Sequence, residues 1–302
     1  MPWPGYCHDT GRDERALTSR GRTHGHRTNL LVMNGDLVNS EKEVKIVVVT
    51  GAASGMGRAC VERVRDLGDV VFAVDVRAPE IDGTVGIACD ITDPSAVAAL
   101  AHQVGEAGRL RALIHAAGIS PTMGDARRVL EVNLVGTQLL LDAFGPMVGP
   151  GSAAVCFAST AAYQVAPYMN PEWEALLDDP LAADFLDRAV AVVSADSGFG
   201  YGLSKVGVVR AVTRAANAWG RRGARINSVS PGIIDTPMGR QELEHQPTMQ
   251  QMLADTPLSR LGQADEVAAV AAFLVSEGAS FVNGIDVLVD GGYVRAGGAA
   301  PS

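Results

Sequence analysis

The chain has 302 residues, of which 47% are apolar and 5% aromatic, and its formal net charge is −9. Its length suffices for a sizeable α/β core, and its acidic balance argues against nucleic acids and anionic membranes as partners. No apolar run reaches the ~18 residues of a membrane span, and no signal-peptide core is evident. The scattered cysteines, without C-x-x-C, indicate neither a disulfide framework nor a metal site, so we expect a reduced, cytoplasmic protein. They are Cys7, Cys60, Cys89 and Cys156.

The first 43 residues differ in composition from the rest of the chain. Gly, Pro, Arg, Asp, Thr and His follow one another there without apolar periodicity, which predicts a disordered N-terminal extension over residues 1–43. His8, His24 and His26 fit a solvated tail, with a metal-binding tract as the alternative reading. We assign the extension no role and expect the folded domain to span residues 44–302.

From residue 44 onward, short runs rich in Val and Ile alternate with segments of helical periodicity. Such alternation predicts one Rossmann-like α/β domain, a doubly wound parallel sheet with helices on both faces. In chain order we expect strand 44–50, helix 58–70, strands 70–75 and 85–90, a helix from Asp93, strand 110–116, helix 125–144, strand 153–159, helix 200–220, strand 224–229, helix 264–276 and strand 286–289.

The first predicted strand ends in a glycine-rich turn with the spacing G-x-x-x-G-x-G. Gly51 allows the tight turn, Gly55 lets the backbone approach a pyrophosphate, and Gly57 lets helix and strand pack closely. Ser54 and Met56 lie between these glycines, where the free N–H groups of the new helix can hold phosphate. By itself, the pattern also fits a tight strand-to-helix connection.

Asp75 closes the second predicted strand, 24 positions after Gly51. An acidic residue at this place accepts hydrogen bonds from both hydroxyls of an adenosine ribose and repels a 2′-phosphate. The sequence therefore predicts NAD(H) as the cofactor. Nearby Arg77 is a counter-signal, because an arginine can accommodate the extra phosphate of NADP(H).

Tyr201 and Lys205 lie four positions apart in the predicted helix 200–220, on one face. A tyrosine with a pKa near 10 is a poor base at neutral pH, but a neighbouring cation favours the phenolate and lowers that pKa. Alone, the pair also fits an ordinary surface helix. After a nucleotide turn and Asp75, it indicates an acid–base pair.

Taken together, the motifs resemble those of the short-chain dehydrogenase/reductase family over about residues 45–293. They occur in the family's order: Thr50-Gly51-x-x-x-Gly55-x-Gly57, Asp90, Ala117-Gly118, Asn133, Ser159, Tyr201-x-x-x-Lys205 and Pro231-Gly232-x-x-x-Thr236. The resemblance implies oxidoreduction with a nicotinamide cofactor. It also implies a homodimer or homotetramer that acts on a small molecule.

The resemblance assigns a role to each motif residue. Tyr201 would be the general acid/base, and Ser159 would hydrogen-bond the substrate oxygen. Lys205 would bind the nicotinamide ribose and lower the Tyr201 pKa, while Asn133 would support a water-linked proton relay. The implied cofactor contacts are Gly51, Ser54, Gly55, Met56, Gly57, Asp75, Asp90, Ile91, Ala117, Gly118, Tyr201, Lys205, Pro231, Gly232, Ile234 and Thr236; no metal is implied.

Two departures from the family pattern are local. Where the family usually has Asn-Asn-Ala-Gly, this chain has His115-Ala116-Ala117-Gly118. We read His115 as a packed strand residue, with a base as the alternative. Thr160 follows Ser159 and could supply the catalytic hydroxyl in its place, although the alignment of strand 153–159 favours Ser159.

The third departure is an insertion, because 42 positions separate Ser159 from Tyr201, many more than in most family members. Residues 164–197 contain two short helical patterns that could roof the substrate site or pack against another subunit. This insertion resembles the bacterial 3α-hydroxysteroid dehydrogenase/carbonyl reductase branch. A second substrate element is a lid over residues 237–261, whose Met238, Met249, Met252 and Leu253 could face an apolar ligand. The alternative is an ordinary packed helix without substrate contact.

These observations predict an NAD(H)-dependent enzyme that interconverts a secondary alcohol and a ketone on an apolar cyclic, steroid- or terpenoid-like substrate. No residue of the lids forms a charged clamp in this reading, so a phosphorylated or carboxylate substrate is not indicated. Two alternatives remain, a 3-oxoacyl thioester reductase and a non-catalytic NAD-binding regulator.

Overall fold

The computed structural model describes residues 30–33, 36–39, 43–68 and 70–298. The chain divides into two units, Met1–Lys42 and Glu43–Ser302, which are described separately. In the first, β1 (Leu30–Met33) and β2 (Asp36–Asn39) pair as an antiparallel hairpin. The other residues up to Lys42, including the three histidines of the predicted extension, lie outside the described residues. The disorder of residues 1–43 therefore stays a prediction.

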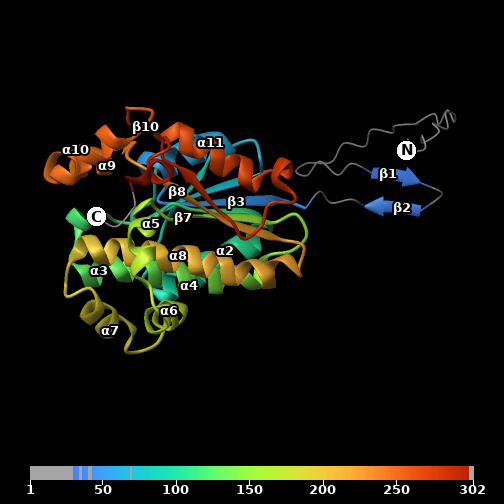
Figure 1. The fold of residues 1–302 in the computed structure, drawn as a ribbon. Coiled ribbons are helices and arrows are strands. Elements are labelled where there is room, and N and C mark those ends of the chain that lie inside the picture. The colour runs from blue at the N-terminus through green and yellow to red at the C-terminus, as the bar shows by residue number, and fades with distance from the viewer. Residues whose placement is uncertain (1–29, 34–35, 40–42, 69, 299–302) are drawn as a thin grey trace, which may run out of the picture. The chain divides into compact units, whose positions relative to one another are not determined.

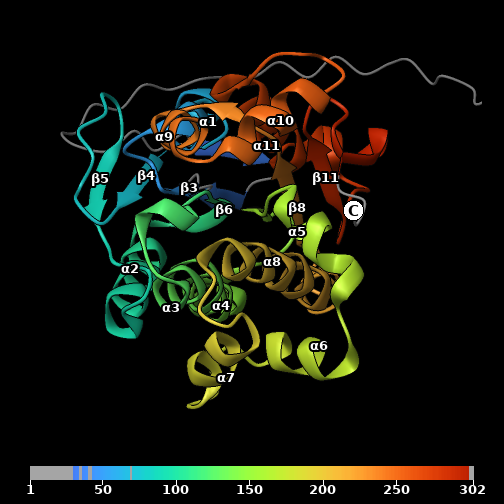
Figure 2. The same ribbon diagram turned by 60° about the vertical axis from the view of Figure 1, so that its left-hand side comes forward.

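A seven-stranded sheet forms the centre of the second unit, and every neighbouring pair in it is parallel. Its order is β11–β8–β7–β6–β3–β4–β5 (Figure 2). The strands are β3 (Lys45–Thr50), β4 (Val70–Asp75), β5 (Val85–Ala88), β6 (Arg109–His115), β7 (Ala153–Phe157), β8 (Arg225–Pro231) and β11 (Asp286–Val289). Since the chain runs outward from β3 in both directions, the predicted doubly wound sheet is confirmed.

Helices cover both faces of this sheet (Figure 1). They are α1 (Gly55–Val64), α2 (Pro94–Ala107), α3 (Ala126–Leu130), α4 (Gly136–Phe144), α5 (Ala161–Val165), α6 (Pro171–Asp178), α7 (Phe185–Val192), α8 (Ser197–Gly220), α9 (Pro237–His245), α10 (Pro247–Asp255) and α11 (Ala264–Val275). The short strands β9 (Ile234–Asp235) and β10 (Gly262–Gln263) pair in parallel on either side of α9 and α10 in the sequence. In the described range, no helix is long and apolar enough to cross a membrane.

The core forms because β3 alternates its side chains between two apolar clusters. Ile46 and Val48 pack with α2, α4 and α8, whereas Val47 and Val49 pack with α1 and α11. All four side chains are fully buried. Burial on both faces explains why this strand is continuously apolar in sequence rather than alternating.

Helix boundaries differ most from the predicted ones in two places. The helix expected over residues 58–70 is α1, which begins at Gly55 and already ends at Val64. A turn closed by Leu67 N–H on the Val64 carbonyl then directs the chain into β4. The helix expected over residues 125–144 is interrupted between α3 and α4 by the π-helical segment η2 (Glu131–Val135). The predicted cap of α2 is confirmed, since Asp93 accepts a hydrogen bond from Ser95 N.

The insertion folds as α6 and α7, at the bottom of Figure 2, and packs against α8 and α3. Its Leu177 and Phe185 join Leu203 of α8 in a third apolar cluster. Arg210 of α8 makes a two-bond ion pair with Asp178 at the end of α6. We expected the insertion either to roof the substrate site or to pack against another subunit. Helices α6 and α7 do not roof the site, because none of their residues lines the cavities described below.

Candidate active site

Two neighbouring cavities open near the carboxyl ends of the strands, and we name them by their lining residues. The first, the glycine-turn cavity, has a volume of about 280 Å³ and lies where the strand order reverses between β3 and β6. Ligands of open α/β sheets bind at this switch point. Most of the residues predicted to contact the cofactor line it: Gly51, Ser54, Gly55, Met56, Gly57, Asp75, Asp90, Ile91, Ala117, Gly118 and Thr236.

The glycine turn itself leaves no room for side chains. At Gly57, an added Cβ would lie 2.0 Å from the Gly51 carbonyl oxygen. At Gly51, where φ is +70°, it would lie 2.7 Å from Ala117 N. The turn therefore packs backbone against backbone and presents the start of α1 to the cavity. No side chain caps this helix start, so its N–H groups and positive dipole end remain available for an anion such as a pyrophosphate.

Asp75 is the last residue of β4, and Asp90 lies two residues after the end of β5. Asp75 accepts hydrogen bonds from Ala53 N at 3.0 Å and from Val76 N at 2.8 Å, which fixes its carboxylate beside the glycine turn. Asp90 accepts hydrogen bonds from the backbone and hydroxyl of Thr92, which lower its pKa. Both carboxylates are thus held in place at the rim of the glycine-turn cavity.

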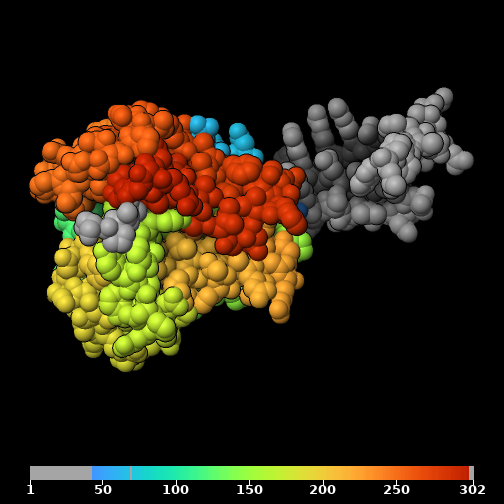
Figure 3. Space-filling model, viewed as in Figure 1, coloured from blue at the N-terminus to red at the C-terminus, as the bar shows by residue number. Residues whose placement is uncertain are grey.

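The second, the serine–tyrosine cavity, has a volume of about 650 Å³. Ser159 and Tyr201 line it, and so do Pro231, Gly232 and Ile234 among the predicted cofactor residues. Three lid methionines, Met238, Met249 and Met252, also line it, whereas Leu253 does not. Met56, Thr236 and Met238 line both cavities, so the two sites are contiguous. The lid helices α9 and α10 lie at the upper left of Figure 3.

Tyr201 is positioned by the first turns of α8, which begins after Asp196 caps the N–H of Phe199 at 2.8 Å. Burial raises the Tyr201 pKa above its ordinary value, a hydrogen bond with Ser159 acts in the opposite direction, and the Glu242 carboxylate raises it further. In the protein alone, burial outweighs the favourable contact. The lowered pKa expected from sequence also counts on the positive charge of a bound cofactor, and it stays a prediction. Ser159 and Thr160 both line the cavity, and the interaction that lowers the Tyr201 pKa comes from Ser159.

Lys205 lies one turn after Tyr201 and is buried. Its Nζ donates a hydrogen bond to the Phe157 carbonyl at 2.9 Å and lies 5.6 Å from the centre of the Tyr201 ring. Burial lowers the Lys205 pKa to about 8. Lys205 lines neither cavity, and its ammonium approaches the site from beneath the tyrosine ring.

Asn133 lies in the π-helical segment η2 and is fully buried. Its side-chain amide holds the backbone of Ile119 from both sides. Asn133 Nδ2 donates to the Ile119 carbonyl at 2.9 Å, and Ile119 N donates to Asn133 Oδ1 at 2.9 Å. A Cβ on Gly118 would lie 2.9 Å from Asn133 Oδ1 and 3.5 Å from Lys205 Nζ, so all three residues meet behind the glycine-turn cavity.

The sequence did not point to Glu242, a carboxylate on α9 that lines the serine–tyrosine cavity and is only 6% exposed. It accepts hydrogen bonds from the backbone and hydroxyl of Thr122 and from the Gln246 amide. These bonds connect the lid to η1 (Pro121–Met123), the turn after β6. The stretch Arg240–Glu244 alternates charged and uncharged residues, and nothing in this pattern distinguishes Glu242 from the exposed Glu244.

His115 is buried at the end of β6, and its two imidazole nitrogens hydrogen-bond to the hydroxyl groups of Thr50 and Thr137. Burial, together with the Lys205 charge, lowers its pKa to about 3. The structure therefore supports the reading of His115 as a packed strand residue and does not support its alternative role as a base.

Acid should destabilise the protein through His115. In the unfolded chain a histidine takes up a proton below about pH 6.5, whereas the folded His115 stays neutral to about pH 3. Stability is thus complete above pH 6.5 and falls by about 1.4 kcal/mol per pH unit below it. In urea unfolding, the loss between pH 7.5 and 5 should be about 2 kcal/mol smaller in His115→Asn than in the wild type. The exposed His102→Asn should keep the wild-type loss, and an equal loss in all three proteins would contradict the prediction.

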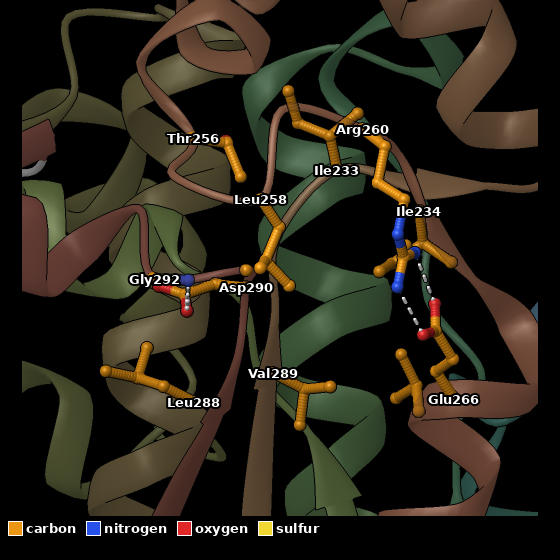
Figure 4. A pocket seen from close by; sticks show the side chains of 13 residues that line it. Ile233, Ile234, Thr256, Leu258, Arg260, Glu266, Leu288, Val289, Asp290 and Gly292 are labelled. Carbon is orange, nitrogen blue, oxygen red and sulfur yellow. Dashed lines mark hydrogen bonds and ion pairs between the residues drawn. The ribbon is translucent and has the colours of Figure 1, made fainter.

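A third cavity of about 410 Å³ lies behind the lid, between β9, β11 and α11. Figure 4 shows its lining, with the Arg260 guanidinium paired to the Glu266 carboxylate and Asp290 accepting a hydrogen bond from Gly292 N. Ile234 is the one predicted site residue that lines it. In the described part of the chain, no group of three His, Cys, Asp or Glu side chains is placed to hold a metal ion.

Comparisons with known proteins agree with this arrangement. A family model described as enoyl-(acyl carrier protein) reductase matches residues 51–175 and 186–294. D-threitol dehydrogenase of Mycolicibacterium smegmatis is 32% identical over 82% of this chain and 92% of that protein. The 3-alpha-hydroxysteroid dehydrogenase/carbonyl reductase of Comamonas testosteroni is 30% identical over 82% and 96%.

Among solved structures, the 3-alpha-hydroxysteroid dehydrogenase from Pseudomonas sp. B-0831 complexed with NADH aligns with a TM-score of 0.72 and 29% identity. The alignment covers 85% of this chain and all of that one. The family match leaves out residues 176–185, which lie inside the insertion. From the motifs, the sheet and these matches, the chain belongs to the short-chain dehydrogenase/reductase family of oxidoreductases.

Proposed function

We propose that the protein is an NAD(H)-dependent oxidoreductase that interconverts a secondary alcohol and a ketone on an apolar cyclic substrate. The observation that carries the proposal is the continuity of the two cavities. Ser159 and Tyr201 line the larger one, the glycine turn lines the smaller one, and Met56, Thr236 and Met238 belong to both. A dinucleotide and an alcohol can therefore meet beside Tyr201.

The residues of the glycine-turn cavity fit a dinucleotide. Gly51 and Gly57 let the turn pack backbone against backbone where a Cβ would clash, and the uncapped start of α1 suits the pyrophosphate. Asp75, at the end of β4, suits an unphosphorylated adenosine ribose. When bound, the nicotinamide supplies the hydride acceptor or donor, while the protein supplies position and charge.

Tyr201 would exchange a proton with the substrate oxygen, and Ser159 would donate a hydrogen bond to that oxygen. A preorganised donor of this kind is typically worth a few kcal/mol in the transition state. Lys205, beneath the tyrosine ring, would favour the phenolate. Asn133 would hold the Gly118–Ile119 backbone and keep Lys205 in place.

The rate should depend on pH in opposite ways in the two directions. Because burial raises the Tyr201 pKa, the phenol is protonated at neutral pH and ready to act as an acid in ketone reduction. Alcohol oxidation requires the phenolate, so its kcat should rise with pH up to the raised Tyr201 pKa, whereas the kcat of reduction should fall only as the pH passes that pKa. Glu242→Gln should move both profiles to lower pH, because the Glu242 charge raises the Tyr201 pKa. Profiles that do not move would contradict this assignment.

The lining of the serine–tyrosine cavity supports an uncharged substrate. Methionines and isoleucines supply much of its surface, which suits an apolar ring system. Its charged lining residues are the carboxylates Glu242 and Asp255, and no Lys, Arg or His is among the described residues that line it. This lining supports the sequence-based expectation that the lids offer no charged clamp for a phosphorylated or carboxylate substrate, and the two carboxylates further disfavour anionic substrates.

Three ring alcohols of similar size test the charge preference: cyclohexane-1,4-diol, 4-aminocyclohexanol and 4-hydroxycyclohexanecarboxylate. We expect kcat/KM for the carboxylate to lie about tenfold below that for the diol, because like charges repel across the cavity. Glu242→Gln should narrow this gap, whereas Glu244→Gln, on the exposed face of α9, should leave it unchanged. Equal rates for all three compounds would show that the carboxylates do not select the substrate.

The proposed function is tested by adding NAD⁺ or NADP⁺ and following the absorbance of reduced nicotinamide. The panel contains steroid, terpenoid, simple cyclic and linear secondary alcohols. We expect activity with NAD⁺ that is highest on cyclic alcohols. Activity on linear 3-hydroxyacyl thioesters alone would favour a 3-oxoacyl thioester reductase, and NADH binding without any turnover would favour a regulator.

A further inference from the structure

We propose that His115 is a positioning residue that locks Asn133 and the wall of the glycine-turn cavity through a one-way chain of hydrogen bonds. The inference rests on the proposed function, because Asn133 matters only if the site performs the reaction. His115 stands where the family pattern usually has asparagine, and nothing in the proposed chemistry uses it directly. Its surroundings nevertheless connect three parts of the site.

Four contacts make up the chain. His115 Nδ1 lies 2.8 Å from Thr50 Oγ1, and Nε2 lies 2.8 Å from Thr137 Oγ1. Thr137 Oγ1 in turn donates to the Asn133 carbonyl at 2.6 Å, and Ala117 N donates to Thr50 Oγ1 at 3.4 Å. His115, Thr50, Thr137 and Asn133 are each at most 2% exposed, so water does not complete these bonds.

The direction of every bond follows from the Asn133 carbonyl, which can only accept. The Thr137 hydroxyl donates its single hydrogen to that carbonyl. The Thr137 oxygen must therefore accept a hydrogen bond from His115, so Nε2 must carry the imidazole hydrogen. In the neutral ring Nδ1 then accepts from the Thr50 hydroxyl, which itself accepts from Ala117 N–H. The chain uses every donor once. Protonated His115 would present a second donor to Thr50 and break this order.

These hydrogen bonds connect both ends of one wall of the glycine-turn cavity. At one end, Thr50 receives Ala117 N–H, where the wall after β6 begins. At the other end is Asn133, whose side-chain amide makes two hydrogen bonds with the backbone of Ile119, two residues after Ala117 in the same wall. Both ends of the segment 117–119 are thus tied to His115, and Gly118 between them faces Lys205. A substitution of His115 or Thr137 should therefore alter the positions of Asn133 and Lys205.

The first test is nitrogen-15 NMR of the imidazoles in the full chain, which needs no substrate. We expect His115 to be neutral with hydrogen on Nε2 and to keep its signals unchanged between pH 8 and pH 5. Its resonance is assigned by its loss in His115→Asn. A hydrogen on Nδ1, or a titration within this range, would overturn the chain of bonds.

The second test compares threonine variants of equal shape. Thr137→Val removes the hydroxyl from the chain, and Thr213→Val removes the same kind of bond, from Oγ1 to the Val209 carbonyl, on the exposed side of α8. We expect kcat to fall about tenfold in Thr137→Val, with KM for the alcohol changed less, and less than twofold in Thr213→Val. Thr137→Ser, which restores the hydroxyl, should recover most of the rate.

The outcomes separate this inference from the proposed function. Equal kcat values in Thr137→Val and Thr213→Val, or a serine variant as slow as the valine variant, would overturn the positioning role. A wild-type protein without turnover on any alcohol would overturn the proposed function, whereas the NMR result would still decide the bond chain.

Discussion

Tyr201→Phe should lose about 10³-fold in kcat for both alcohol oxidation and ketone reduction, since positioned acid–base groups contribute roughly 10²–10⁴-fold. The change removes only the phenolic oxygen and keeps the ring that packs over Lys205. NADH affinity should remain within about twofold, because the glycine-turn cavity is lined by other residues. Steady-state kinetics together with NADH fluorescence titration check both parts.

Tyr163→Phe is the matched control. It removes a phenolic hydroxyl that donates to Asp286 at 2.8 Å, and Tyr163 does not line the serine–tyrosine cavity. The control should keep most of its activity even though a hydrogen bond is lost. If Tyr201→Phe behaved like Tyr163→Phe, Tyr201 would not be the acid/base, and the regulator reading would gain support.

Asp75→Ala should shift the ratio of kcat/KM for NAD⁺ over NADP⁺ by about 100-fold toward NADP⁺. Two causes add: the loss of charged hydrogen bonds to the ribose, each worth about 1.5–3 kcal/mol, and the relief of repulsion toward a 2′-phosphate. Arg77, exposed two residues later, would then be free to favour the phosphate. Parallel initial-rate measurements with the two cofactors give the ratio.

Asp82→Ala removes an exposed carboxylate that does not line the glycine-turn cavity and should leave the ratio unchanged. A wild-type enzyme that prefers NADP⁺ would contradict the role of Asp75 and assign the cofactor choice to Arg77. Unchanged selectivity in Asp75→Ala would place the ribose elsewhere in the cavity.

The sheet and the glycine turn could be predicted because both follow from local rules. A strand buried on both faces must be apolar throughout, as Ile46 to Val49 are, and Gly51 and Gly57 occupy places where no side chain fits. Spacing alone also placed Tyr201 and Lys205 on one face of α8. Ser159 and Tyr201 meet in one cavity although they lie 42 positions apart, since the insertion packs outward against α8.

Other features depend on contacts between distant segments, and the sequence does not reveal them. The buried carboxylate of Glu242 accepts hydrogen bonds from Thr122, which lies 120 positions away in the sequence. The raised pKa of Tyr201 reflects burial and the charge of Glu242 on the lid, which neighbouring residues in the sequence do not reveal. Likewise, the π-helical turn at Asn133 interrupts a segment whose periodicity reads as one continuous helix.

Deuterium transfer tests the central claim most directly. The best cyclic alcohol of the panel, deuterated at its carbinol carbon, is incubated with NAD⁺ and the wild-type protein. The mass of the reduced cofactor is then measured by mass spectrometry. Our account predicts NADH that carries one deuterium, with formation about 10³-fold slower in Tyr201→Phe. Reduced cofactor without deuterium, or equal rates in the two proteins, would contradict hydride transfer at a site governed by Tyr201.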